Sequence, residues 1–570
     1  MAKVVECVPN ISEGRDKHII EQCANAAAAV DGCTLLDVDP GADTNRTVIT
    51  LAGEPEAVLE GAFQLIAMSH KLIDMRKHTG EHPRAGATDV CPFVPVSDMT
   101  MDECVELAKR LGKRVGDELD VPVYLYEFAA SKEEWRNLAV VRKGEYEALP
   151  KKMSDPEWKP DFGPHEMRPK FGAIHISARK FLIAYNINLN STYARLAKDI
   201  ALKIREQGSL LRDRKRQIVR NEKGKGKKVP GLFKACKAAG WYLADYHVAQ
   251  VTMNLTDPDV TLPHQVFETV RDLARDMGTR VTGSEIVGLI PLQAMLEAGT
   301  YYLRKQGRSL ALHEREIVQI AIQSMGLNEI SEFDMDKKIV EYAIADKGGA
   351  PLANMTLVEF NDELASESPA PGGGSVAALV GSLAASLAAM VGNLTHGKFE
   401  YEDAWDEVEA AGIKGQELKA RLLHAIDADT DAFNAVMAAN RLPDKTEDQA
   451  AAKAKAVDDA NKTATLIPFS VCEDSLAIYD LIDVVAAKGN PNSVSDAGVA
   501  AFCANTAVHG AALNVRINLP GIADTAWADE KRAQVKAMTD EADKRLQQVR
   551  AQVDKVLSEQ RKKAEADNDD

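Results

Sequence analysis

The segment HTGEHPR, at residues 78–84, holds the side chains with the clearest capacity for chemistry. His78, Glu81 and His82 have the H-x-x-E-H spacing of an inverted zinc-protease motif. Alternatively, one of these histidines lies in a rigid loop and transfers protons without a metal, because imidazole titrates near neutral pH. The neighbouring residues decide which chemistry the segment favours.

The backbone around the two histidines disfavours the zinc interpretation. Such a site needs one continuous helix, so that residues four positions apart face the same metal ion. Gly80 destabilises a helix inside the motif, and Pro83 moves His82 away from helical geometry. We therefore expect no metal site. Instead, Pro83 and Gly86 hold a rigid loop in which a histidine titrates near neutrality and Arg84 supplies a permanent cation.

The composition is that of a multidomain globular protein. The chain has 570 residues, too many for one hydrophobic core, with 45% hydrophobic and 27% charged residues. Its net charge of −17 argues against nucleic-acid binding as its overall role. The eight cysteines form no C-x-x-C pair and the N-terminus has no apolar signal segment, so we expect a reducing, cytoplasmic environment.

The first 307 residues alternate strand and helix signals in two similar runs. The first run, over residues 1–180, predicts strands at 4–8, 33–39, 47–51, 90–96 and 121–126, with helices at 16–29, 55–73 and 101–119. The second run, over residues 181–307, predicts strands at 181–189, 241–245, 249–255 and 280–282, with helices at 192–207, 263–277 and 292–304. Both contain the order β-α-β-β-α-β, so we predict two related α/β subdomains of the split βαβ type.

Residues 308–348 have the pattern of a helical linker, and beyond them strand signals disappear. Helices predicted at 355–366, 375–394, 401–440, 446–482, 494–516 and 527–563 make residues 349–570 an all-helical bundle. The uncharged stretch 376–394, VAALVGSLAASLAAMVGNL, approaches the ~20 residues of a membrane span. Because it is mostly weakly apolar Ala, Ser and Gly, we expect a helix buried inside the bundle and no membrane association.

A basic segment interrupts the second subdomain. Residues 212–228, RDRKRQIVRNEKGKGKK, contain nine Lys or Arg against Asp213 and Glu222, a net charge of +7. Its glycines are not followed by the GK[ST] of a phosphate-binding loop. A solvated surface loop is the simpler interpretation, and the alternative is electrostatic attraction of a polyanionic substrate tail.

Many separate segments resemble one enzyme family. HTGEHPRAGATDVCPFVPV resembles the catalytic segment of glutamate formiminotransferase, as do VECVPNISEGRD (5–16), LLDVDPGADTNRTVITLAG (35–53) and GWYLADYHVAQVTMNLTD (240–257). From residue 359, EFNDELASESPAPGGGSVAALVGSLAASLAAMVGNLT, then DADTDAF and NRLPD, resembles formiminotetrahydrofolate cyclodeaminase. In this order the segments resemble the bifunctional formiminotransferase-cyclodeaminases of histidine degradation.

The resemblance implies two folate reactions. The first transfers the formimino group of N-formimino-L-glutamate to N5 of tetrahydrofolate. The second closes N10 onto the formimino carbon, releases ammonia and gives 5,10-methenyl-tetrahydrofolate. Tetrahydrofolate, with one or several glutamates, is then a co-substrate, no metal is required, and a homo-oligomer is expected. The alternative is a folate-binding scaffold with only one active domain.

The resemblance also implies site residues. The family's catalytic histidine falls on His82, and Asp39, near Asp37 and Asp43, is the carboxylate expected to orient or charge it. The catalytic aspartate of the second reaction falls on Asp429. The family's folate-binding loop, GPHEMRPKFG, falls on Gly163, Pro164, His165, Glu166, Met167, Arg168, Pro169, Lys170, Phe171 and Gly172. In this loop Arg168 and Lys170 are expected to attract the carboxylates of folate.

A glycine run precedes the apolar helix. PAPGGGS places Gly372–Gly374 directly before Ser375. Ser375 can cap the helix, or the glycine N–H groups can bind an anionic or carbonyl group at the helix N-terminus. The sequence leaves both possibilities open.

Overall fold

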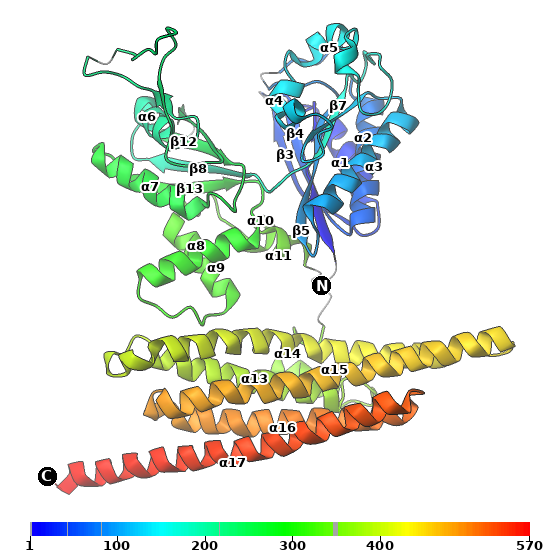
Figure 1. Ribbon diagram of the computed structural model, residues 1–570, viewed down its shortest axis with the longest axis vertical. Coiled ribbons are helices and arrows are strands. Elements are labelled where there is room, and N and C mark those ends of the chain that lie inside the picture. Colours follow the sequence, from blue (N-terminus) through cyan, green and yellow to red (C-terminus); the bar gives the residue numbers. More distant parts are fainter. Residues whose placement is uncertain are drawn as a thin grey trace. The chain divides into compact units, whose positions relative to one another are not determined.

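The computed structural model describes residues 3–42, 44–80, 82–215, 217–244, 246–345 and 351–569. Asp43, Glu81, Arg216, Asp245 and residues 346–348 of the predicted linker lie outside these ranges. The chain forms two compact units, one made of Met1–Gly299 and Val318–Ala345, the other of Thr300–Ile317 and Asp346–Asp570 (Figure 1).

The first unit begins with a mixed sheet covered by helices on one face. Its strands are β1 (Val4–Cys7), β2 (Asn10–Ile11), β3 (Cys33–Gly41), β4 (Arg46–Gly53), β5 (Thr88–Ser97), β6 (Val123–Glu127) and β7 (Ile174–Ala178). The helices α1 (Lys17–Ala28), α2 (Pro55–Leu72) and α3 (Met101–Leu119) cover that face, whereas the short helices α4 (Leu138–Val141) and α5 (Glu145–Met153) pack on the other face, beside β5 and β6. β3, β4, β1 and β5 are successive antiparallel neighbours, and β7 and β6 extend the sheet beyond β5 in parallel.

Side chains alternate across this sheet, as the pleat of a strand requires. In β1, Val5 and Cys7 are fully buried in the core that α1, α2 and α3 share with the sheet. In β4, Ile49 and Leu51 lie in the same core. The residues between them, Glu6 among them, therefore belong to the opposite face, which none of these helices covers.

The second subdomain repeats the first on a smaller scale. It contains β8 (Ile183–Leu189), α6 (Ala194–Ile204), β11 (Cys236–Leu243), β12 (Val248–Leu255), α7 (Pro263–Asp276), β13 (Val281–Val287) and α8 (Leu292–Lys305). Its sheet has the order β11-β12-β8-β13, with every neighbouring pair antiparallel. This matches β3-β4-β1-β5 strand for strand. The predicted fold class of two related split-βαβ subdomains is therefore confirmed.

The predicted linker is helical within the described residues. Its helices are α9 (Glu314–Met325), α10 (Met335–Lys338) and α11 (Val340–Ile344). Residues 318–345 fold with the first unit, and residues 300–317 with the second.

The second unit is a bundle of long helices, as predicted. Its helices are α12 (Leu357–Leu364), α13 (Gly373–Thr395), α14 (Trp405–Asn440), α15 (Glu447–Lys488), α16 (Val494–Asn518) and α17 (Thr525–Asp569). α13 packs along α14 and α16, and its small residues allow close approach: a Cβ on Gly381 would lie 2.7 Å from Ser475 Oγ. Among the described helices, α13 alone is long and apolar enough to cross a membrane, but 61% of its apolar stretch is buried in the bundle.

Candidate functional site

A cleft of about 850 Å³ lies in the first unit. One wall is the open face of the first sheet, where alternate positions of four strands point outward. The other wall comes from β8, β11, β12 and the segments beside them. The polar side chains of the first wall include Glu6, Asn10, Asp37, Asp39, Arg46, Thr50 and His82, and those of the second include Lys180, Glu206, Lys234, Lys237, Asn254 and Asp257.

His82 faces this cleft, and its Nε2 has no hydrogen-bond partner among the residues that the structure describes. Its Nδ1 lies 2.7 Å from the carbonyl oxygen of Pro83, and a carbonyl can only accept a hydrogen bond. Nδ1 must therefore carry the hydrogen, which leaves a lone pair on Nε2. Burial lowers the pKa of His82 to about 4, and the positive charge of Arg46 adds to this effect. The ring is thus a neutral base at physiological pH, not a group that titrates near neutrality as the sequence suggested.

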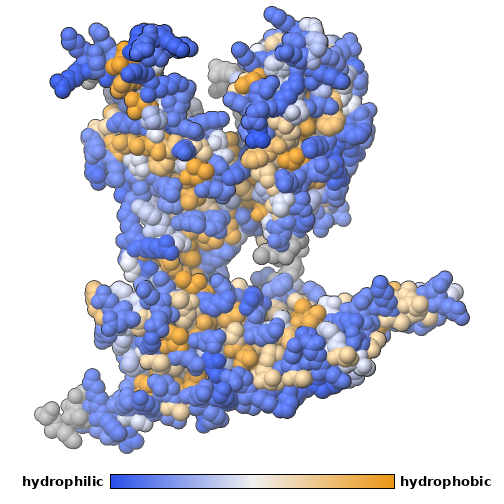
Figure 2. All heavy atoms as spheres, viewed as in Figure 1, coloured by the Kyte–Doolittle hydropathy of each residue, from blue (hydrophilic) through white to orange (hydrophobic). Residues whose placement is uncertain are grey.

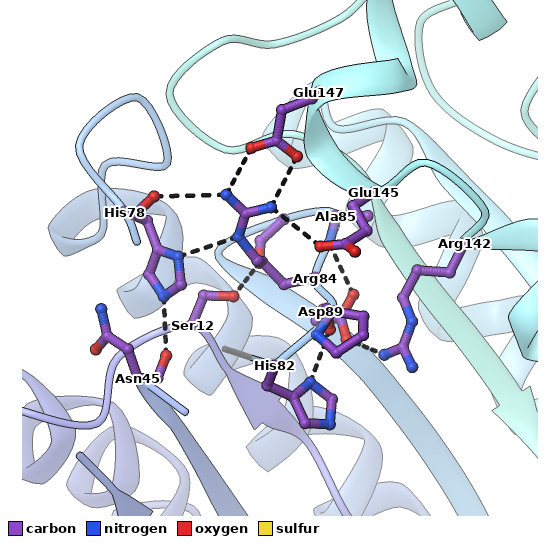
Figure 3. Close-up of polar contacts among 12 residues, drawn as sticks. Ser12, Asn45, His78, His82, Arg84, Ala85, Asp89, Arg142, Glu145 and Glu147 are labelled. Carbon is purple, nitrogen blue, oxygen red and sulfur yellow. Dashed lines mark hydrogen bonds and ion pairs between the residues drawn. The ribbon is translucent and has the colours of Figure 1, made fainter. Parts of the chain in front are cut away.

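His78 has a structural role in the same loop. Arg84 donates from Nε to His78 Nδ1 over 3.2 Å, so His78 Nε2 carries the hydrogen and donates to the backbone oxygen of Asn45 over 2.8 Å (Figure 3). Both ring nitrogens are occupied, which removes the first ligand of the zinc motif. Its middle residue, Glu81, lies outside the described residues. No group of three or more His, Cys, Asp or Glu able to hold a metal occurs among the residues that are described.

Arg84 binds two glutamates and so holds the loop in place. Its guanidinium bonds both carboxylate oxygens of Glu147, at 2.7 and 2.8 Å, and lies 3.3 Å from Glu145 (Figure 3). A bidentate pair of this kind is geometrically specific. Arg84 therefore joins the loop to α5, and Figure 3 shows the His82 ring turned away from this network.

Asp89 is buried behind His82 between two arginines. Its Oδ2 lies 2.5 Å from Arg46 Nη1 and 2.6 Å from Arg142 Nη1, and its Oδ1 accepts the backbone N–H of Ala85 over 2.9 Å. Burial raises the pKa of Asp89, but the two guanidinium groups outweigh burial and hold that pKa at about 2. Both arginines also line the cleft, so Asp89 keeps two cations in place near His82.

This arrangement predicts that Asp89→Asn will destabilise the first unit by about 3–5 kcal/mol, because two buried cations would lose their carboxylate. Calorimetry of the full chain should show a lower melting temperature for that unit. Asp74→Asn, which removes the partner of the exposed Arg76, should leave it nearly unchanged. In the wild type, stabilisation by Asp89 is fully present above the ordinary carboxyl pKa near ~4 and is lost as pH falls through about 2.

Asp39 lies in the same cleft as His82 but is not bonded to it. Asp39 is an exposed residue of β3 on the cleft face of the sheet. Within the described part of the chain, the hydrogen bond that orients His82 comes from Pro83 and none comes from Asp39. Its role in the reaction stays a prediction.

The predicted folate loop does not line the cleft. Gly172 pairs with Gly86 in an isolated β-bridge, so the loop contacts the segment that follows His82. Its two cations are engaged elsewhere: Arg168 pairs with Asp120 at 2.7 Å, and Lys170 donates to the backbone oxygen of Lys71 over 2.7 Å. The remaining loop residues, from Gly163 to Phe171, are likewise absent from the lining of the cleft.

Several cleft residues were not predicted from the sequence. Glu6, Asn10 and Arg46 are the clearest of these. A signal was present, because polar residues at alternate positions of otherwise apolar strands mark the uncovered face of a sheet. In VVECVPN, for example, Glu6 stands between the core residues Val5 and Cys7.

In the second unit, Asp429 of α14 lies beside the start of α13. Ser375 Oγ donates to the backbone oxygen of Ile426 over 2.9 Å and lies 3.3 Å from Asp429 Oδ2. A Cβ on Gly374 would lie 2.1 Å from Asp429 Oδ1, so any larger residue at this position would displace the Asp429 carboxylate. Burial raises the pKa of Asp429, and hydrogen bonds from Ser375 partly oppose this.

Two details of this site refine the sequence interpretation. The residue that caps α13 is Gly372, so the proposal that Ser375 caps the helix through its side chain is wrong. Asp427, the other aspartate of the pair, is 5% exposed and accepts the backbone N–H groups of Leu352 and Ala353. Asp427 therefore fixes the chain before α12, whereas Asp429 faces the helix start.

Comparisons with known proteins cover both units. Residues 4–179 match the family described as formiminotransferase domain, N-terminal subdomain, and residues 184–345 match formiminotransferase domain. Residues 356–537 match formiminotransferase-cyclodeaminase. The chain is 41% identical to formimidoyltransferase-cyclodeaminase of Rattus norvegicus over 95% of this chain and 97% of that protein. The chain belongs to the formimidoyltransferase-cyclodeaminase family.

Shorter relatives match the two parts separately. Glutamate formimidoyltransferase of Streptococcus pyogenes is 41% identical, over 53% of this chain and 94% of that protein. Methenyltetrahydrofolate cyclohydrolase of Methylorubrum extorquens is 41% identical, over 33% of this chain and 91% of that protein. In this member of the formimidoyltransferase-cyclodeaminase family, His82 and its cleft thus lie in the formiminotransferase region, and Asp429 lies in the cyclodeaminase region.

Proposed function

We propose that the protein carries out two successive folate reactions. It transfers the formimino group of N-formimino-L-glutamate to N5 of tetrahydrofolate, then cyclises the product to 5,10-methenyl-tetrahydrofolate and ammonia. The observation that supports this proposal most directly is the unprotonated Nε2 of a neutral histidine, His82, in a large polar cleft. We further propose a cytoplasmic homo-oligomer, as the resemblance implies.

In the first reaction, N5 attacks the formimino carbon and must lose its proton. His82 Nε2 can accept that proton because the ring is neutral and its other nitrogen is fixed by Pro83. Lys234 and Lys237, exposed on the opposite wall, supply positive charge for the carboxylates of the substrates. Asp39 remains the proposed carboxylate on the His82 side of the cleft.

In the second reaction, N10 attacks the same carbon and ammonia leaves. One proton moves from N10 to the departing nitrogen, and no water is consumed. Asp429 suits this transfer because partial burial raises its pKa toward the working pH. Its carboxylate is held by Ser375 at a helix N-terminus.

The direct test supplies purified protein with N-formimino-L-glutamate and tetrahydrofolate. Glutamate, ammonia and the absorbance of 5,10-methenyl-tetrahydrofolate should appear in equal amounts. Supplying 5-formimino-tetrahydrofolate alone tests the second step separately. If only one step occurs, the protein is a folate-binding scaffold with one active domain, and the bifunctional proposal fails.

The basic segment is a structured arm whose ends are close in sequence to residues that line the cleft. β9 (Ser209–Leu210) pairs with β10 (Lys228–Val229), and two further bridges, Arg212–Ile218 and Arg220–Gly226, make a three-stranded arm. Leu210 and Ile218 pack over Gly226, leaving most charged side chains exposed. The arm is hydrophilic at its end (Figure 2). It starts and ends within a few residues of Glu206 and Lys234, which line the cleft.

We propose that this arm attracts the glutamate tail of polyglutamylated folate. Replacing Lys223, Lys225 and Lys227 by Ala should raise the KM for polyglutamyl tetrahydrofolate, most strongly at low salt, because exposed charges are screened beyond ~10 Å at 0.1 M. The monoglutamyl form should respond little. The matched control replaces Lys555, Lys562 and Lys563 of α17. Equal effects on both folates, or on neither, would leave the arm a solvated loop.

A further inference from the structure

Glu6 is a buried carboxyl group of the cleft, and it takes no part in the proton transfers assigned to His82 and Asp429. It lies in the middle of β1, paired with Ala52 of β4 and Val94 of β5. Its neighbours Val5 and Cys7 point into the core, so its side chain points to the cleft face that also bears His82. The residue is only 5% exposed.

Among the residues that the structure describes, none forms a hydrogen bond or ion pair with this carboxyl group. The charged groups acting on it are Arg179 and, from α11, Glu341, and the cleft wall around it carries Asp37 and Arg46. Burial raises the pKa of Glu6 to about 7, Arg179 partly opposes burial, and Glu341 adds to it. A substantial share of Glu6 is therefore a protonated acid at neutral pH.

The reaction requires a proton donor as well as a base. When the bond from the formimino carbon to the glutamate nitrogen breaks, the electron pair stays on nitrogen, which must be protonated to leave. His82 in its resting form offers no proton at Nε2, since its hydrogen is on Nδ1 and bound to Pro83. Paired groups with opposed pKa values are a common way to divide acid and base roles.

We propose that Glu6 is the catalytic acid that protonates the departing glutamate nitrogen, while His82 removes the proton from N5. This inference rests on the proposed formimino transfer. The bond between N5 and the formimino carbon forms as the N5 proton moves to His82 Nε2. The bond to the glutamate nitrogen breaks as the Glu6 proton moves to that nitrogen. Proton return from the imidazolium to the Glu6 carboxylate restores both groups.

The test measures glutamate release with tetrahydrofolate from about pH 4 to about pH 9, without relying on the second reaction. In the wild type, kcat should fall as pH drops toward about 4, because His82 must be neutral, and fall again as pH rises through about 7, because Glu6 must be protonated. Glu6→Gln should lower kcat about 10²-fold and abolish the high-pH decline, with little change in KM.

The matched control is Glu127→Gln, because Glu127 is a half-buried carboxyl of the same cleft whose pKa is also raised by burial. This variant should retain both the low-pH and the high-pH decline in kcat. The assignment is overturned if Glu6→Gln keeps the high-pH decline, if it changes only KM, or if Glu127→Gln removes the decline instead. Retention of the full profile in Glu6→Gln would assign both proton transfers to His82.

Two measurements cover a Glu6→Gln variant that does not fold. The melting temperature of the first unit reports whether that unit folds, and ammonia release from 5-formimino-tetrahydrofolate reports whether the second unit is intact. Glu6→Asp, which keeps the carboxyl group, should retain the high-pH decline at reduced kcat. In the wild type, the infrared band of a protonated carboxyl group should vanish as pH rises through about 7, and its absence would overturn the proposal. A wild type that releases no glutamate would instead refute the proposed function.

Discussion

His82→Ala should abolish formimino transfer and leave the second reaction nearly intact. A general base typically contributes ~10²–10⁴-fold, so kcat for glutamate release should fall by that factor. Ammonia release from supplied 5-formimino-tetrahydrofolate should persist, because Asp429 and its helices belong to the other unit. Separate assays of glutamate and ammonia measure the two steps. Added imidazole should restore part of the transfer, since the variant lacks only a neutral base.

The control for this variant is His18→Ala, which removes an exposed histidine of α1 in the same unit. Both reactions should then continue at wild-type rates. If His82→Ala loses both activities while its melting temperature is unchanged, the two sites are not separable. If it loses neither, a group other than His82 takes the N5 proton.

The elements could be predicted from the sequence wherever their periodicity is local. α3 has the predicted bounds, Met101–Leu119, because Thr100 and Glu103 form a capping box and the apolar residues repeat at helical spacing. β7, Ile174–Ala178, was not predicted. It is a short, fully buried strand without alternation, and its parallel partners β5 and β6 are distant in sequence.

The candidate site could be predicted in its chemistry but not in its contacts. The segment around His82 identified a loop histidine, and Gly80 and Pro83 argued correctly against a helix there. The low pKa of His82 arises from burial and from the charge of Arg46, which lies near His82 in space but far from it in the sequence. Arg84 was expected to supply a cation to the site, yet Glu147 and Glu145 engage it because α5 packs against the loop. Such pairings depend on tertiary structure.

The choice between Asp427 and Asp429 shows the same limit. The two residues are identical in type and lie two positions apart on α14, so their side chains project from different sides of the helix. Only the structure shows that Asp427 binds backbone N–H groups while Asp429 contacts Ser375 at the start of α13. The family resemblance had favoured Asp429, and the contacts give a physical reason for that preference.

Asp429→Asn should therefore stop the second reaction and make 5-formimino-tetrahydrofolate accumulate. The amide keeps the size of the side chain and can still accept a hydrogen bond from Ser375, but it cannot take the N10 proton. The expected loss in kcat for ammonia release is ~10²–10⁴-fold. Chromatography of the folate products should show the intermediate, and glutamate release should continue at the wild-type rate.

Asp431→Asn provides the matched control, because Asp431 is an exposed residue two positions further along α14. The same substitution there changes the charge of the helix equally without touching Ser375. A wild-type rate of ammonia release is expected. Should Asp431→Asn impair the reaction as strongly as Asp429→Asn, the effect would be one of general charge. Should Asp429→Asn form 5,10-methenyl-tetrahydrofolate at the wild-type rate, proton transfer in the second unit would belong to another group, since Asp429 would then serve only to hold the start of α13.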